Sequence, residues 1–240
     1  MGEQRRKSEI TALQIQKAIL EGRYKPGDRL PPERSLADEY GVSRSILREA
    51  VKHLAGIGLI RTEAQSGSYV TDYGQEASLE FLIYLLENNE TLNPDIFRSL
   101  LDFRELLELG AVERAAELSD PDFIDTLSGK LQLMREAASD VILLTERDYD
   151  FHRMIINKTG NLAFKLLFNA CRSVYTFYAG EFYRIPEHVD HTFFQLENLI
   201  AAFERKDKSS AVAIMKSALS YGRTSIYESL DITAVPQNLQ

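Results

Sequence analysis

The hydrophobic pattern of the chain changes near residue 75, and this change restricts the possible folds more than any other feature. Upstream, three short amphipathic stretches lead into an alternating segment, "LIRTEAQSGSYVTDYG". Downstream, apolar residues recur at helical spacing as far as residue 229, interrupted only by short breaks. The sequence therefore predicts a mainly α protein, with a small head of helices and a hairpin followed by an all-α body.

Three short helices and a β-hairpin are expected in the head. The stretch "SEITALQIQKAILEGRY" has one broad apolar face and ends at "KPGD". "PPERSLADEYG" begins with proline and stops at Gly41, while "VSRSILREAVKHLAGIG" begins at Ser43, a good N-cap, and stops at Gly58. The alternating segment indicates a hairpin that turns at Ser66-Gly67, and a hairpin after three helices is typical of a winged helix-turn-helix.

The body is predicted to be a bundle of six or seven helices. Turn signals at Asn93-Pro94, Asp120-Pro121, Gly160 and Pro186 separate them. The expected helices are 76–88, 94–118, 121–138, 143–159, 161–182, 188–206 and 208–229. The domain organisation that follows is a head over 1–74, a body over 75–230 and a frayed tail over 231–240.

Composition excludes several classes of protein. With 44% hydrophobic and 27% charged residues, the chain has the composition of an ordinary globular protein. No apolar run approaches the ~20 residues that cross a bilayer, and the N-terminus lacks the apolar core of a secretion signal. The single Cys171 rules out an internal disulfide and any Cys-rich zinc motif, so we expect a cytoplasmic protein.

The net charge of −8 is unevenly distributed. The head has 12 Lys and Arg against 10 Asp and Glu, whereas the rest of the chain has 16 against 26. A mildly basic head on an acidic body suggests different partners for the two parts. The overall balance does not exclude nucleic acid as a partner, because binding depends on local basic faces.

The two head helices joined by "YGVS" fit a helix-turn-helix, which would present the first turn of its second helix to the major groove of DNA. Small residues at the hairpin tip would allow its backbone to approach the sugar-phosphate edge. The candidate DNA-contacting residues are Arg34, Ser43, Arg44, Ser45, Arg48, Gln65, Ser66 and Gly67. Periodicity alone favours a plainer alternative, a three-helix bundle with ordinary surface arginines.

The string "YKPGDRLPPERSLADEYGVSRSILREAVKHLAGIGLIRTEAQSGSYV" closely resembles the winged helix-turn-helix of the GntR superfamily of bacterial transcription regulators. The resemblance covers about residues 8–72 and is highly specific. It implies a homodimer on palindromic operator DNA, in keeping with the two-fold symmetry of such proteins. It places the DNA-contacting positions at Arg34, Ser43, Arg44, Ser45, Arg48 and Gly67.

Three segments of the body resemble the FCD-type ligand domain of the FadR subgroup, over residues 78–229. They are "LDFRELLELGAVERAAEL", "DYDFHRMIINKTGN" and "LIAAFERKDKSSAVAIM". The resemblance implies a regulator whose affinity for DNA changes when a small-molecule effector binds in the helical body.

Many members of this ligand domain bind a divalent metal through an Asp, a His four residues later and two further histidines. The resemblance places the first two ligands at Asp148 and His152, but Leu196 and Ala218 occupy the other two positions. Two protein ligands would hold a metal weakly, since zinc normally has three or four. The sequence therefore identifies no definite cofactor. A divalent metal is possible but disfavoured.

Three interpretations of the pair Asp148 and His152 remain open. Asp148 could orient a partly buried His152 through a hydrogen bond, or His188 or His191 could complete a weak metal site. The third interpretation is an acid–base pair, which would make the body an enzyme or metal-binding protein with DNA binding incidental. No nucleophile or phosphate-binding glycine loop accompanies the pair, so the sequence favours a regulator that is not an enzyme.

The aromatic segment "FKLLFNACRSVYTFYAGEFYRIPE" is a core or dimer contact by default. It also resembles the fatty-acid-responsive regulators for which the FadR subgroup is named, which implies a fatty acyl-CoA effector. Arg104 and Arg172 could instead neutralise a small carboxylate, or could be surface ion-pair residues. The candidate effector-binding residues are Arg104, Asp148, His152, Arg172 and Tyr175.

Overall fold

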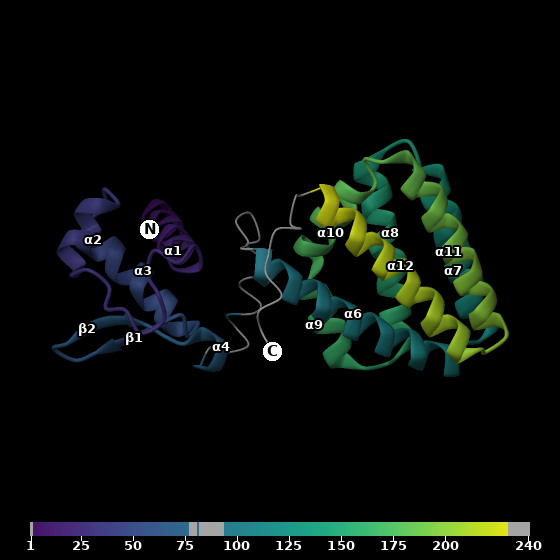
Figure 1. Cartoon of the computed structure of the whole chain (residues 1–240), viewed down its shortest axis with the longest axis horizontal. Helices are drawn as coiled ribbons and strands as arrows, with labels where there is room; N and C mark the ends of the chain where they lie inside the picture. Colours follow the sequence, from purple (N-terminus) through teal and green to yellow (C-terminus); the bar gives the residue numbers. More distant parts are fainter. Residues whose placement is uncertain (1, 77–80, 82–93, 230–240) are drawn as a thin grey trace. The chain divides into compact units, whose positions relative to one another are not determined.

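The computed structural model describes residues 2–76, 81 and 94–229, and it divides the chain into two compact units, Met1–Asn93 and Pro94–Gln240 (Figure 1). The first unit contains α1 (Gly2–Leu20), α2 (Glu33–Glu39), α3 (Arg44–Gly56), β1 (Ile60–Glu63), β2 (Gly67–Val70) and α4 (Tyr73–Glu76). The mainly α fold with an N-terminal winged helix-turn-helix is thus confirmed.

Helix α3 forms the centre of the first unit because one of its faces is apolar. Leu47, Ala50, Val51 and Leu54 recur at helical spacing and are buried, and α3 packs against both α1 and α2. The helix starts where expected, since the Ser43 hydroxyl accepts a hydrogen bond from the Ile46 amide at 3.4 Å.

The loop of the hairpin lies earlier in the chain than the predicted turn at Ser66-Gly67. Glu63 pairs with Gly67, so the loop consists of residues 64–66 and Gly67 already belongs to β2. Gln65 takes the left-handed conformation, with φ of 63°, and Ser66 N donates to Glu63 O at 3.1 Å. The predicted turn at Ser66-Gly67 is therefore wrong, because a three-residue loop closes this hairpin.

The second unit contains seven helices within residues 94–229. They are α6 (Pro94–Glu117), α7 (Pro121–Glu136), α8 (Val141–Lys158), α9 (Leu162–Ala170), α10 (Arg172–Phe182), α11 (Pro186–Glu204) and α12 (Lys208–Ser229). Side-chain caps explain three of the starts: Asp120, Asp140 and Asn161 each accept a hydrogen bond from a first-turn amide. The helices pack as a bundle, in which α12 runs beside α6 and α11 (Figure 1).

The single helix predicted over 161–182 is wrong, because the chain forms two helices, α9 and α10, that meet at Cys171. The Cys171 side chain is buried at this junction, and Phe168 and Val174 on either side are buried as well. The change of direction lets both short helices pack on α8.

Two predictions lie outside the described residues. The helix over 76–88 and the tail over 231–240 fall almost entirely on residues that the structure does not describe. The domain boundary after residue 74 stays a prediction too. In the part that is described, α4 spans that position, and the Tyr73 and Phe81 rings lie 5.8 Å apart.

Candidate functional site

The start of α3 presents three exposed polar residues, Ser43, Arg44 and Ser45. The two serine hydroxyls bond each other at 3.0 Å, and Gln4 of α1 donates to Ser45 at 3.4 Å. Arg44 has no ion pair among the described residues, so its guanidinium is available to an external anion or base edge.

The other predicted DNA-contacting arginines have different surroundings. Arg48 donates through Nε to Glu33 Oε2 at 2.8 Å, in an ion pair whose two side chains are both exposed. Arg34 is exposed at the start of α2 and makes no ion pair within the described part of the chain. A carboxylate thus competes for Arg48 but not for Arg34 or Arg44.

The predicted wing residues lie on the hairpin loop and the first position of β2. Gln65 is exposed at the tip, whereas the Ser66 hydroxyl is bonded to the Tyr69 hydroxyl at 2.6 Å. Gly67 has φ of 119°, a conformation that side chains other than glycine rarely adopt.

The second unit contains a cavity of about 50 Å³ between α6, α8, α10, α11 and α12. Arg104, Asp148 and His152 are among its polar lining residues, together with His191, Thr192 and Gln195, and Tyr178, Phe182 and Met215 are among its apolar ones. The cavity thus brings three of the five predicted effector-binding residues together.

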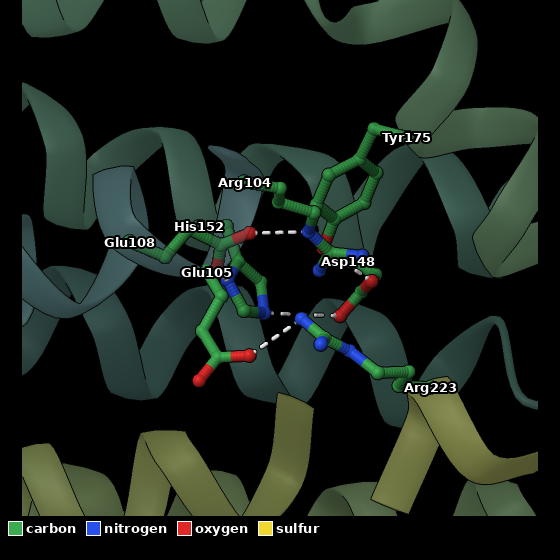
Figure 2. A network of polar contacts seen from close by, with 7 residues as sticks. All are labelled: Arg104, Glu105, Glu108, Asp148, His152, Tyr175 and Arg223. Atoms are coloured by element: carbon green, nitrogen blue, oxygen red, sulfur yellow. Dashed lines mark hydrogen bonds and ion pairs between the residues drawn. The ribbon is translucent and has the colours of Figure 1, made fainter. Parts of the chain in front are cut away.

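Arg104, Asp148 and His152 belong to a buried network of polar and charged groups (Figure 2). Arg104 Nε donates to Glu108 Oε1 at 2.5 Å, and the other oxygen of Glu108 bonds to His152 Nδ1. The Tyr175 hydroxyl donates to Asp148 Oδ2 at 2.6 Å. The Arg104 guanidinium also lies over the Tyr175 ring, 4.1 Å from its centroid. The network joins α6, α8 and α10.

Glu108 and His152 stay charged although both are buried. Burial alone would raise the pKa of Glu108, but Arg104 and His152 outweigh it and lower the pKa to about 2. Burial would likewise lower the pKa of His152, but the Glu108 carboxylate outweighs it and raises the pKa. Glu108 therefore stays ionised and favours the imidazolium form of His152.

Asp148 does not orient His152 through a hydrogen bond, so that prediction is wrong. His152 Nε2 and Asp148 Oδ1 are 3.7 Å apart, which exceeds hydrogen-bond distance. Glu108 on α6 orients the ring instead. Asp148 Oδ1 is left buried without a hydrogen-bond partner among the described residues. An unpartnered carboxylate oxygen beside the cavity is a group that a ligand or a water molecule can satisfy.

A metal does not fit the donor set in the described part of the second unit. Asp148, His152 and His191 line the cavity, whereas His188 does not, and the described residues contain no group of three His, Cys, Asp or Glu placed to hold an ion. Of the two positions where the family resemblance expects histidines, Ala218 lines the cavity and Leu196 is buried without lining it. Since zinc sites have three or four protein ligands, we derive no metal chemistry here.

Two predicted effector-binding residues do not line the cavity. Arg172 is exposed on α10 and pairs with Glu146 through Nη2 and Oε2 at 2.5 Å. Tyr175 lies one layer behind, where it holds Asp148 and packs on Arg104. The place of Glu108 four residues after Arg104 indicates that the two can pair, but nothing in the sequence predicts that Glu108 also orients His152.

Gly222 on α12 leaves space for the side chain of Tyr178, which lines the cavity. A Cβ atom at Gly222 would lie 2.2 Å from the Tyr178 hydroxyl oxygen, so Gly222→Ala is expected to displace Tyr178 and destabilise the protein by about 1–3 kcal/mol. Urea unfolding followed by circular dichroism measures the change.

Gly129→Ala is the matched control for this substitution. Gly129 lies inside α7, and a Cβ atom there would meet nothing within 4 Å. Alanine at this position is therefore expected to stabilise the protein by about 0.5–1 kcal/mol. Equal effects of the two substitutions would contradict the role of Gly222.

The two units together define a class of protein, a DNA-binding regulator with a helical ligand domain. Residues 7–70 match the gntR family of bacterial regulatory proteins, and residues 99–220 match the FCD domain. The chain belongs to the GntR family, as a transcription regulator with an FCD ligand-binding domain.

Relatives of known name are also transcription regulators. The chain is 33% identical to the HTH-type transcriptional regulator Mce2R of Mycobacterium tuberculosis, over 68% of this chain and 67% of that protein. It is 30% identical to LutR of Bacillus subtilis, over 65% and 69%. It is 27% identical to the fatty acid metabolism regulator protein of Haemophilus influenzae, over 94% and 91%.

Solved structures share the fold. Streptococcus agalactiae GntR superposes with a TM-score of 0.50 and 24% identity, covering 91% of this chain and 99% of that one. Lar of Listeria monocytogenes superposes with a TM-score of 0.59 and 18% identity, covering 92% and 96%. Within the described residues, no helix has both the length and the apolar character required to cross a membrane.

Proposed function

We propose that the protein binds palindromic operator DNA as a homodimer and that a small metabolite in the cavity of the second unit changes its affinity for DNA. The head over 1–74 carries the DNA contacts, the body over 75–230 binds the effector and dimerises, and residues 231–240 form a tail. The site of action is the cytoplasm, where operator DNA is found. The free Arg44 at the capped start of α3 supports the DNA-binding role.

The proposed effector is a small carboxylate rather than a fatty acyl-CoA. The supporting observation is a cavity of about 50 Å³, which suits a few water-sized groups, whereas drug-sized ligands occupy roughly 300–1,000 Å³. His152 Nε2 would donate to the ligand carboxylate, and a hydroxyl group on the ligand would donate to Asp148 Oδ1. Arg104 is already paired with Glu108, so it acts by holding the network rather than by direct binding.

We infer no catalytic or metal-binding role for Asp148 and His152. A general base must accept a proton, whereas the Glu108 carboxylate raises the pKa of His152 and favours its imidazolium form, whose Nε2 can only donate. Turnover of a substrate that His152→Ala abolishes would contradict this inference.

Selection from a random duplex library by the full-length protein tests the DNA-binding role. The expected product is a duplex with an inverted repeat, bound by two chains as measured by light scattering. Failure to enrich any sequence would contradict operator recognition. One chain per duplex would contradict the homodimer.

Release from the selected duplex tests the effector. A panel of small hydroxy- and dicarboxylates is titrated into the complex, and fluorescence anisotropy of the labelled duplex is measured. At least one carboxylate is expected to shift the affinity, and EDTA is expected to have no effect. Release by palmitoyl-CoA alone would favour the acyl-CoA effector instead.

Two matched substitutions on α8 locate the effector. Asp148→Asn removes the unpartnered acceptor beside the cavity and is expected to abolish the response to the carboxylate without weakening binding to the duplex. Asp150→Asn is the control, since Asp150 pairs with Arg153 at 2.6 Å and does not line the cavity. An equal loss of response in both variants would contradict the cavity as the effector site.

A further inference from the structure

Arg29 lies in an extended segment, residues 28–30, that pairs with β2 of the hairpin. Leu30 N donates to Ser68 O at 2.8 Å, and Val70 N donates to Asp28 O at 2.9 Å. Arg29 itself forms an antiparallel bridge with Tyr69. Its backbone is therefore fixed to β2, while its side chain is exposed.

The guanidinium of Arg29 occupies the space that a side chain at position 67 would need. A Cβ atom at Gly67 would lie 3.1 Å from Arg29 Nε, closer than an ordinary contact, and 3.4 Å from Nη2. Glycine at 67 thus has two roles: it permits φ of 119° and it leaves room for the guanidinium. The exposed Arg29 guanidinium thus lies beside the wing at Gly67.

No carboxylate neutralises Arg29 within residues 2–76 and 81. By contrast, three other exposed arginines of the first unit have acidic partners. Arg23 pairs with Glu39 at 2.6 Å, Arg48 with Glu33 at 2.8 Å and Arg61 with Glu63 at 3.2 Å. A planar guanidinium that is positioned and unpaired matches the geometry of a phosphate group.

We infer that Arg29 is a further DNA-contacting residue, which binds a backbone phosphate beside the wing and is positioned there by Gly67. The inference rests on the proposed DNA-binding function. A phosphate contact adds affinity for any duplex but carries no sequence information, whereas a contact to a base edge affects only the selected site. This difference makes the assignment testable.

The experiment measures the affinity of the full-length protein for the selected duplex and for a scrambled duplex of the same length, from 0.05 to 0.3 M KCl. Arg29→Ala is expected to weaken binding to both duplexes by about tenfold and to reduce the slope of log affinity against log salt by about 2, because the proposed homodimer loses two phosphate contacts. Arg29→Lys, which keeps the charge, is expected to retain the slope. Arg29→Gln gives a second neutral variant, and thermal melting checks the fold of each.

Arg23→Ala is the matched control, because it removes the same charge from an arginine that Glu39 already neutralises. Its salt slope is expected to equal that of the wild-type protein. If Arg29→Ala and Arg29→Gln also keep the wild-type slope, the inference is overturned. A loss confined to the selected duplex overturns the phosphate contact in favour of a base contact. If the wild-type protein enriches no duplex, the proposed function itself has failed.

Discussion

Arg44→Ala is expected to lower the affinity for the selected operator by about a thousandfold, while the fold and the weak binding to scrambled DNA are retained. An arginine that reads a guanine edge contributes roughly 1–3 kcal/mol, and a homodimer on a palindrome loses two such contacts. A loss of about 4 kcal/mol corresponds to a factor of about one thousand. Fluorescence anisotropy at fixed salt measures the affinity.

The structure explains why Arg44 should dominate over Arg48. Arg48 must leave Glu33 before it can contact DNA, whereas Arg44 has no such partner in the described residues. Arg23→Ala again serves as the control for lost charge. An unchanged operator affinity in the Arg44 variant would rule out α3 as the recognition helix.

Glu108→Ala is expected to destabilise the protein by about 3–5 kcal/mol, which would be the largest stability effect of the proposed substitutions. It leaves Arg104 and His152 inside the bundle without their shared carboxylate, and breaking a buried ion pair from one side costs about this much. Urea unfolding measures the change. Glu113→Ala on the same helix removes an exposed partner of Lys208 and is expected to cost at most about 1 kcal/mol.

The effect of Glu108→Ala should also depend on pH. The pKa of Glu108 is about 2 in the folded protein, below its ordinary 4.5, so its stabilisation is present above pH 4.5 and is lost as the pH falls through about 2. The pKa of His152 is raised above 6.5, so its stabilisation is present below 6.5 and is lost as the pH rises through the folded value. The difference in unfolding free energy between the two proteins should therefore be largest between 4.5 and 6.5. A difference that does not change with pH would mean that Glu108 acts by packing alone.

Several helix starts in both units could be predicted because their signals are local. Ser43, Asp120 and Pro186 stand at helix starts, and caps and prolines act within one turn of the chain. Ser66-Gly67 predicts the wrong tip for the hairpin, because a glycine in a loop usually marks the turn itself. Gly67 instead lies in β2 beside Arg29, a contact between positions 38 residues apart that no local pattern reveals.

The site could be predicted only in part, for the same reason. The spacing of Asp148 and His152 correctly placed both on one face of α8, where they meet the cavity. The partner that orients His152 comes from α6, 44 residues upstream, and depends on how two helices pack. The break between α9 and α10 at Cys171 could not be predicted, because no proline or glycine stands there.

The helix that carries Arg104 and Glu108 begins at Pro94, where the second unit begins. It is therefore the first helix of the second unit. His152 lines the cavity, and it is bonded to this helix through Nδ1 while its Nε2 lies 3.7 Å from Asp148 Oδ1. A ligand bound to His152 Nε2 would therefore be connected to α6 through a single carboxylate, that of Glu108.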